Sequence, residues 1–262
     1  MGRQIRCHHI RVPTDLTGRV VLVTGGTKGL GRGLAAAFAQ AGAEVMVCAR
    51  HRPDGDPVGE FVAADLRDAE QAAAVVAAAV DRCGRLDVVV NNAGGSPPAA
   101  AADASPRFVE RIVALNLLAP FYVAQPANRI MQQQPAGGTI INIASLSGRR
   151  PSPGTAAYGA AKAGLANLTQ TLAMEWAPKV RVNTVTVGYL ETEQAELFYG
   201  DADGVAAVAE TIPMRRLVQP ADVAAVCLFL ASDAAAFITG ADVTVDGGGE
   251  PPPYLAARSA GS

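Results

Sequence analysis

The segment YGAAK places a phenol and an ammonium four residues apart, at Tyr158 and Lys162. The apolar spacing around the segment predicts a helix over about residues 155–177, and positions i and i+4 share one helix face. A free phenol titrates near pH 10, about three units from neutrality. A neighbouring ammonium stabilises the phenolate and lowers its pKa, so the pair is typical of a proton-transfer group. The alternative is a plain surface pair on a helix.

Two further polar residues could assist such a proton transfer. Ser145 ends the apolar segment TIINIAS, where its hydroxyl could hydrogen-bond a substrate oxygen whose charge changes. Ser147 is an alternative on the same loop. Asn116 lies in the otherwise apolar helical segment IVALNLLAPF, and a buried asparagine needs hydrogen-bond partners. A kinked core helix and a catalytic role explain Asn116 equally well.

The segment TGGTKGLG, residues 24–31, combines three glycines (Gly25, Gly29 and Gly31) with Lys28. Glycines let backbone N–H groups approach a pyrophosphate, and a helix that follows offers its positive end. A glycine follows Lys28 where a Walker-type ATP loop has Ser or Thr, which disfavours an ATP site. Taken alone, the loop could also be a packing turn, but an expected strand precedes it and an expected helix follows.

The second expected strand, EVMVCAR, ends in Arg50. Dinucleotide folds that prefer NAD usually carry an acid there, about 20 residues after the loop, to bind the ribose 2′-hydroxyl. In this chain no acid follows until Asp54. A guanidinium can bind a 2′-phosphate through two parallel hydrogen bonds, with Lys28 as a second cation. These residues favour NADP(H) over NAD(H), and a solvated arginine is the alternative.

Composition excludes several other classes of function. The chain has 262 residues, 50% hydrophobic and 18% charged, with a net charge of −2, so a folded domain is expected and nucleic acid is an unexpected partner. No apolar stretch is expected to reach the ~18 residues that a membrane helix needs. The 3 histidines and 4 scattered cysteines lack metal-site spacing, so no metal is expected. Free thiols and the lack of a secretory signal predict a cytoplasmic protein.

Strand and helix patterns alternate along the chain. This alternation predicts an α/β fold with a Rossmann-type doubly wound parallel sheet and helices on both faces. Two separate helices are expected near residues 108–118 and 121–134, and a polar helical segment near 191–211. One domain is expected over residues 16–250, between a flexible tail at 1–15 and a second tail at 251–262. Ligands of such sheets bind at the carboxyl ends of the strands, where the polar segments 24–31, 91–94, 145–148 and 188–192 should meet.

Together these motifs resemble the short-chain dehydrogenase/reductase family, in its single-domain branch of about 250 residues. The resemblance extends from about Gly18 to Gly249 and includes TGGTKGLG, NNAG, YGAAK, RVN and ITGADVTVDGG. It implies a sheet of about seven strands, an oxidoreductase activity, and a homotetramer or homodimer. One departure is Val187-Gly188, where the family usually has Pro-Gly. Proline would fix φ there, so its absence predicts a looser loop over the nicotinamide.

The resemblance also implies roles for individual residues. Asn116 would hold a water in a proton relay, and Ser145 would orient the substrate oxygen. Tyr158 would exchange the proton, and Lys162 would bind the nicotinamide ribose and lower the tyrosine pKa. Asp65 with Leu66 matches the adenine site. Asn91, Ala93 and Gly94 match the adenosine side, and Gly188, Leu190 and Thr192 match the stretch over the nicotinamide. The implied cofactor-binding residues are Gly25, Thr27, Lys28, Gly29, Leu30, Gly31, Arg50, Asp65, Leu66, Asn92, Ala93, Gly94, Tyr158, Lys162, Gly188, Leu190 and Thr192.

We therefore expect an NADP(H)-preferring oxidoreductase that interconverts a ketone or aldehyde with an alcohol. The substrate is a small molecule that the variable segment 191–214 does not identify. One alternative is a 3-oxoacyl-[acyl-carrier-protein] reductase-like enzyme, although Met174 in LAMEWA stands where such enzymes often have a basic residue. Another alternative is a non-catalytic dinucleotide-binding regulatory protein, which the presence of all four expected catalytic residues disfavours. A third keeps the chemistry but uses NAD.

Overall fold

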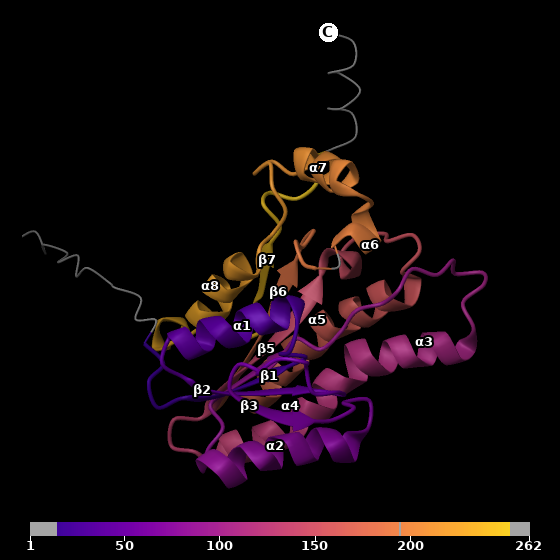
Figure 1. Cartoon of the computed structure of the whole chain (residues 1–262). Helices are drawn as coiled ribbons and strands as arrows, with labels where there is room; N and C mark the ends of the chain where they lie inside the picture. The colour runs from indigo at the N-terminus through magenta and orange to yellow at the C-terminus, as the bar shows by residue number, and fades with distance from the viewer. Residues whose placement is uncertain (1–14, 194, 252–262) are drawn as a thin grey trace, which may run out of the picture.

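The computed structural model describes residues 15–193 and 195–251. It confirms the expected fold class: seven parallel strands form one sheet in the order β3-β2-β1-β4-β5-β6-β7, with helices on both faces (Figure 1). The tails expected at residues 1–15 and 251–262 lie almost wholly outside the described residues. The strands are β1 Val20–Thr24, β2 Glu44–Ala49, β3 Glu60–Ala63, β4 Val88–Asn91, β5 Gly138–Ser145, β6 Val180–Val187 and β7 Asp242–Val245.

The central strand β1 shows why apolar runs form this sheet. All five of its residues are buried, because helices cover both faces. Alternate side chains of a strand point to opposite faces. Val21 and Val23 belong to one hydrophobic cluster, and Val20 and Leu22 belong to the other. The domain therefore has two cores, one on each side of the sheet.

Within residues 15–193 and 195–251, two long helices cover the first face and three cover the second. Helices α1 (Gly29–Gln40) and α8 (Pro220–Ala231) contribute Leu34, Phe38 and Leu230 to the first core. The second core contains side chains of the remaining long helices, which are α2 (Ala69–Cys83), α4 (Ala119–Gln133) and α5 (Ala156–Trp176). Short 3₁₀ turns, η2 (Leu146–Gly148) and η3 (Asp233–Ala235), follow β5 and α8.

The two helices expected near residues 108–118 and 121–134 are one continuous helix. Helix α3 (Pro106–Val113) runs through a π-helical turn, η1 (Ala114–Leu118), directly into α4. Asn116 lies inside this turn and is fully buried. Wide turns of this kind insert one residue into a helix and occur frequently at functional sites.

The same continuous helix corrects one expectation about membranes. Over Pro106–Gln133 it contains an 18-residue window of mean hydropathy 1.2, which is long and apolar enough for a membrane span by length and composition alone. About 33% of that window is buried inside the protein, where α4 packs on the sheet. Core helices of folded domains meet the same criterion, so this stretch alone is weak evidence for a membrane span.

A helical segment lies beyond the carboxyl ends of the strands. It consists of α6 (Ala195–Tyr199) and α7 (Ala202–Thr211), which connect β6 to α8 and are drawn in orange in Figure 1. The sequence pattern predicts helix over about residues 191–211, and the structure divides it into these two short helices. We call residues 189–211 the lid segment, because its residues line the pocket described below.

Candidate active site at the carboxyl ends of the strands

A pocket of about 1090 Å³ lies at the carboxyl ends of β1, β2, β4, β5 and β6. It brings together the four polar segments expected to meet there. Three of the four expected catalytic residues line it, and so do all but one of the expected cofactor-binding residues. The predicted residues that line the pocket are Gly25, Lys28, Gly29, Leu30, Gly31, Arg50, Asp65, Leu66, Asn92, Ala93, Gly94, Ser145, Tyr158, Lys162, Gly188, Leu190 and Thr192. The structure does not place Thr27 or Asn116 on the pocket wall.

The glycine loop forms one end of the pocket between β1 and α1. Gly29 has φ of 51°, a left-handed conformation that favours glycine. A Cβ atom at Gly31 would lie 2.1 Å from the carbonyl oxygen of Gly25, so no larger residue fits without a backbone shift. No side chain caps the start of α1, and no acid lies in its first turn. This cradle therefore offers free N–H groups and a positive helix end to an anion.

Two side chains fix the glycine loop to the end of β4. The Thr24 hydroxyl accepts hydrogen bonds from the backbone N–H groups of Asn92 and Ala93, each at 3.0 Å. The Asn92 amide donates to the carbonyl oxygens of Thr24 and Gly25 at 2.9 and 3.3 Å. Asn91, in contrast, lies in the sheet interior and donates to Asn142 Oδ1 at 2.9 Å. Of the NNAG segment, Asn92 and not Asn91 therefore lines the pocket.

Two cations stand at this end of the pocket. Lys28 and Arg50 are both exposed pocket residues, and neither forms an ion pair with any residue in the described ranges 15–193 and 195–251. Asp65 differs, because the Arg67 guanidinium binds its carboxylate, with Nε 2.8 Å from Oδ1 and 3.1 Å from Oδ2. Hydrogen bonding from Arg67 lowers the pKa of Asp65. Sequence reasoning missed Arg67, although its position two residues after Asp65 was a usable signal.

Lys162 forms the centre of the site. Its side chain is buried, and Nζ donates a hydrogen bond to the carbonyl oxygen of Ile143 at 2.7 Å. The same Nζ lies 5.7 Å from the centroid of the Tyr158 ring, so the helix spacing brings the two groups together as predicted. Burial lowers the pKa of Lys162 to about 8, because desolvation disfavours the ammonium. The pKa of the Lys162 ammonium therefore lies about one unit above neutral pH.

Tyr158 corrects the expectation of a lowered phenol pKa. Burial raises the pKa of Tyr158, and a hydrogen bond with the Ser145 side chain lowers it by a smaller amount. Tyr199 of the lid segment raises the pKa of Tyr158 further. The chain alone therefore keeps this phenol protonated at neutral pH.

Asn116 is held by bonds to its own surroundings behind the pocket wall. Its Oδ1 accepts from the Gly95 N–H at 2.8 Å, and its Nδ2 donates to the carbonyls of Gly95 and Ile112 at 3.0 and 2.9 Å. A Cβ atom at Gly94 would lie 2.7 Å from Asn116 Oδ1 and 3.2 Å from Lys162 Nζ. Asn116 therefore positions the loop that lies against Lys162. These contacts fit the core-helix interpretation, and its role in a proton relay stays a prediction.

The backbone remains hydrogen-bonded at Val187-Gly188, where the family usually has Pro-Gly, directly before the lid segment begins. Val187 pairs with Ser145 of β5 and Val245 of β7, so β6 keeps both neighbours to its last residue. The Gly188 N–H then donates to the Val245 carbonyl at 2.9 Å. A Cβ atom at Gly188 would lie 2.9 Å from the Cα of Asp246, a close approach that a side chain would disturb.

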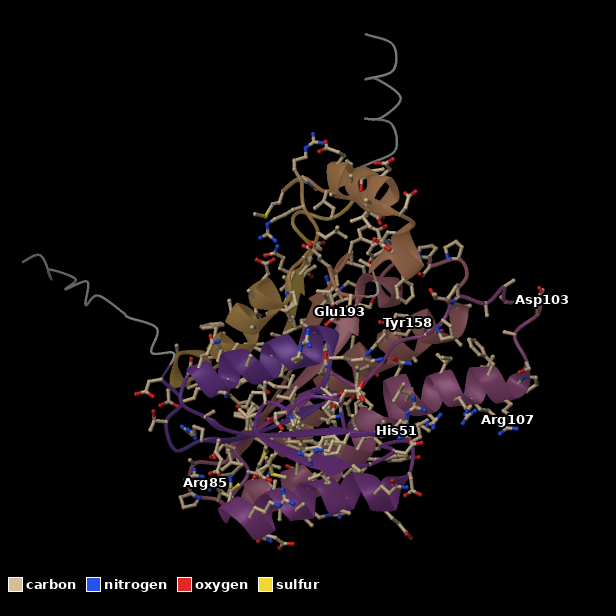
Figure 2. All side chains as sticks on the ribbon, in the orientation of Figure 1. His51, Arg85, Asp103, Arg107, Tyr158 and Glu193 are labelled. Carbon is tan, nitrogen blue, oxygen red and sulfur yellow. The ribbon has the colours of Figure 1, made fainter. Side chains whose placement is uncertain are left out.

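The lid segment is bonded both to its surroundings and within itself. Arg32 of α1 pairs with Glu193 at 2.5 Å, and the Tyr189 carbonyl accepts from the Val218 N–H at 2.8 Å. Within the segment, the Leu190 N–H donates to the Tyr199 hydroxyl at 3.2 Å. Figure 2 shows Tyr158 and Glu193 between the sheet and helices α6 and α7, whereas Asp103 and Arg107 lie at the edge of the molecule. Sequence reasoning missed Arg150 and Tyr189, which line the lid side of the same pocket.

The fold and this pocket define a dinucleotide-binding oxidoreductase class, and comparisons with known proteins specify the family. The family model described as "Enoyl-(Acyl carrier protein) reductase" matches residues 25–250. The chain is 38% identical over 243 residues to an uncharacterised oxidoreductase of Mycobacterium tuberculosis (strain CDC 1551 / Oshkosh), covering 89% of this chain and 92% of that protein.

Two further comparisons agree with this match. A 3-oxoacyl-[acyl-carrier-protein] reductase of Synechocystis sp. (strain ATCC 27184 / PCC 6803 / Kazusa) is 36% identical over 248 residues, covering 90% of this chain and 98% of that protein. The ligand-free structure of Thermoplasma acidophilum aldohexose dehydrogenase superimposes with a TM-score of 0.85 at 30% identity, covering 90% of this chain and 95% of that one. The chain belongs to the short-chain dehydrogenase/reductase family of oxidoreductases, which bind a nicotinamide dinucleotide.

Proposed function

We propose that this protein is an NADP(H)-dependent oxidoreductase that interconverts a ketone or aldehyde with the corresponding alcohol. One observation carries the proposal: a single pocket has two exposed cations at its glycine-loop end and Ser145, Tyr158 and Lys162 on another wall. Cations that no described acid neutralises favour a cofactor with an additional phosphate. The hydroxyl–phenol–ammonium group is suited to proton transfer.

The residues present fit a dinucleotide phosphate. The missing side chain at Gly31 leaves backbone room where a Cβ atom would collide with Gly25, and the uncapped start of α1 lies beside it. Lys28 and Arg50 would hold the 2′-phosphate, with Arg50 presenting parallel N–H donors. Gly188, Leu190 and Thr192 would lie against the nicotinamide. The bound dinucleotide would supply or accept the hydride at the carbonyl carbon.

The chain's own groups would handle the proton. Ser145 would donate a hydrogen bond to the substrate carbonyl oxygen and stabilise the charge that develops on it. The Tyr158 phenol, protonated at neutral pH, would give its proton to that oxygen during reduction and accept one during oxidation. Buried Lys162 stays close to the phenol and would bind the nicotinamide ribose. Its ammonium would lower the cost of forming the phenolate.

A second candidate is a 3-oxoacyl-[acyl-carrier-protein] reductase-like activity, which the Synechocystis relative supports. Such an enzyme must dock an acidic carrier protein. Met174 of α5 is 84% exposed and offers no charge at a position where those reductases often have a base. We therefore favour a small-molecule substrate. Assembly as a homotetramer or homodimer stays a prediction.

The test is a screen of carbonyl compounds with NADPH and with NADH, following cofactor absorbance. We expect turnover with NADPH and a lower kcat/KM with NADH. The screen should include small ketones, aldehydes, aldose sugars in the oxidative direction and acetoacetyl thioesters of a carrier protein. Binding of NADPH without turnover of any compound would favour the regulatory alternative.

A further inference from the structure

Arg150 lies on the lid side of the pocket, where the mechanism above gives it no role. It follows η2 and shares the pocket wall with Ser145 and Tyr158. Its guanidinium lies 5.7 Å from the centroid of the Tyr189 ring, and its NH2 group donates to the Tyr189 hydroxyl at 2.9 Å. The Tyr189 ring contacts the Tyr199 ring edge-on, with centroids 5.6 Å apart. Arg150, Tyr189 and Tyr199 therefore form a contiguous group on the wall of the pocket that Tyr158 also lines.

The Arg150 guanidinium is incompletely satisfied. Its NH1 donates to the Pro151 carbonyl at 3.1 Å, but its buried Nε has no hydrogen-bond partner. A buried donor without a partner costs free energy, so such groups usually have a functional or solvent explanation. A planar guanidinium whose Nε–H is free can donate to a second oxygen beside the one bound at NH2, which is the geometry of a carboxylate.

A carboxylate of the chain itself already contacts Arg150. Glu250, near the end of the described residues, pairs with Arg150 NH2 at 2.5 Å and also accepts from the Tyr189 hydroxyl. Its side chain is 36% exposed and that of Arg150 is 33% exposed, so the pair is accessible to solvent and exchangeable. The pair also leaves Nε unsatisfied. Glu250 therefore binds Arg150 in only one of the two positions that a free carboxylate could use.

The remaining charges of the pocket favour an anion on the lid side. The described acids that line it are Asp65 and Glu193, and each is already paired, with Arg67 and Arg32 respectively. A second carboxylate near Arg150 would thus meet no unpaired acid on the described pocket wall. The hydroxyls of Ser147, Ser152 and Thr155 form a hydrogen-bonded group on the same wall and add polar partners.

We propose that Arg150 is the specificity-determining residue for a carbonyl substrate that carries a carboxylate, and that Glu250 occupies this anion site until the substrate displaces it. The proposal rests on the proposed function, because it names the substrate class of the same site. The substrate is an oxo acid, or the matching hydroxy acid in the oxidative direction. Tyr158 and Ser145 act on its carbonyl while Arg150 and Tyr189 bind its carboxylate.

The test compares straight-chain oxo acids, with two to five carbons between carbonyl and carboxylate carbons, with their methyl esters. We expect wild type to prefer at least one acid over its ester. Arg150→Met should raise the KM for that acid by about 10- to 100-fold, the loss of one charged hydrogen-bonding group. Its KM for the ester should stay unchanged. Glu250→Gln should lower the KM for the acid and leave that for the ester unchanged.

Matched controls separate the site from general disturbance of these loops. Arg149→Met removes the neighbouring arginine, which pairs with Asp242 at 2.6 Å and does not line the pocket. Glu60→Gln removes an exposed glutamate outside the lid segment and the pocket wall, paired with Arg82 at 2.6 Å. Both variants should keep the wild-type preference for acid over ester. Equal KM values for acid and ester in wild type, or equal losses for both in Arg150→Met, would overturn the proposal.

Calorimetry keeps the inference testable if no compound is turned over, an outcome that counts against the proposed function. Glutarate serves as a non-reactive probe, titrated into the full chain saturated with NADPH. We expect wild type to bind it, Glu250→Gln to bind it more tightly and Arg150→Met to bind it more weakly. Identical affinities in Arg150→Met and Arg149→Met would show that Arg150 is not an anion site.

Discussion

The two ends of the pocket are built in different ways. At the glycine-loop end, backbone forms the cradle between β1 and α1, where a Cβ atom at Gly31 would lie 2.1 Å from a carbonyl oxygen. At the lid end the wall consists of long side chains held by pairs such as Arg32–Glu193 and Arg150–Glu250, which join residues 161 and 100 positions apart. Backbone contacts depend on the fold itself, whereas side-chain pairs can change without changing the fold.

This difference separates the residues that every substrate needs from the residues that select the substrate. The glycine loop, the end of β4 and the Tyr158–Lys162 face of α5 support any dinucleotide-dependent proton transfer. Arg150, Tyr189 and the lid helices decide which carbonyl compound reaches Tyr158. Substitutions in the first group should therefore abolish function for every substrate, and those in the second should alter substrate choice.

Removing the Tyr158 hydroxyl should have the largest effect. Tyr158→Phe deletes the proton donor while keeping the ring, so we expect kcat to fall by about 10²–10⁴-fold for every substrate. The Kd for NADPH, measured by fluorescence titration, should not change. Tyr122→Phe on α4, outside the pocket wall, is the control. A Tyr158→Phe variant with wild-type kcat would remove the catalytic assignment.

Filling the backbone cradle should have the next largest effect. Gly31→Ala introduces an overlap with the Gly25 carbonyl that costs about 1–3 kcal/mol, equivalent to about 5- to 150-fold in the Kd for NADPH. Gly55→Ala is the matched control, because nothing lies within 4 Å of its Cβ position. Thermal unfolding of both variants distinguishes weaker binding from lower stability. Equal Kd values for the two variants would mean that the cradle does not hold the cofactor.

The buried ammonium predicts a pH-dependent difference in stability. Lys162 has a pKa of about 8 when folded, against 10.5 when exposed, so the cost of its burial is complete below pH 8. Between about pH 8 and 10.5 the unfolded state binds more protons, and the stability of wild type rises with pH. Relative to Lys162→Met, wild type should gain about 1.4 kcal/mol per pH unit across that range. Denaturant titrations at several pH values measure the free energy of unfolding of both proteins. If the difference between them did not change with pH, the pKa of Lys162 would be the same in the folded and unfolded states, which would contradict its burial.

Opening the lid contact should have the smallest effect. Both partners of the Arg32–Glu193 pair are more than half exposed, so Glu193→Gln should cost less than about 1 kcal/mol and raise the substrate KM by a few-fold. The effect should shrink in high salt. Glu60→Gln, which breaks another exposed pair with Arg82, should leave KM unchanged. A rise in the substrate KM of Glu193→Gln as large as the rise in the Kd for NADPH of Gly31→Ala would contradict the distinction between the backbone cradle and the side-chain wall.

The glycine-loop end of the pocket and the Tyr158–Lys162 pair could be predicted from the sequence, because their residues lie in short motifs. Spacing alone brings Tyr158 and Lys162 onto one helix face, and an apolar run followed by glycines implies the strand, loop and helix. The uninterrupted helix through Asn116 was not predictable in this way. Within the π-helical turn the asparagine bonds to Gly95, which is distant in sequence, and no local pattern predicts that contact.

The lid end of the pocket could not be predicted either, because its contacts join residues that are distant in sequence. Arg150 meets Glu250 only after β5, β6 and β7 have assembled, and no local pattern predicts that contact. The pKa of Tyr158 also depends on tertiary burial, which outweighs the hydrogen bond with Ser145 and reverses the expected direction. Residue types named the reacting groups correctly, but their electrostatic environment required the folded chain.

The most direct test of the account is the ratio of kcat/KM with NADPH to kcat/KM with NADH. Wild type should prefer NADPH, and Lys28→Ala combined with Arg50→Ala should lower the ratio by at least about 100-fold, since each charged contact contributes about one to two decades. Arg52→Ala, whose guanidinium lies over Phe61 outside the pocket wall, should keep the wild-type ratio. A wild-type preference for NADH, or an unchanged ratio in the double variant, would contradict it.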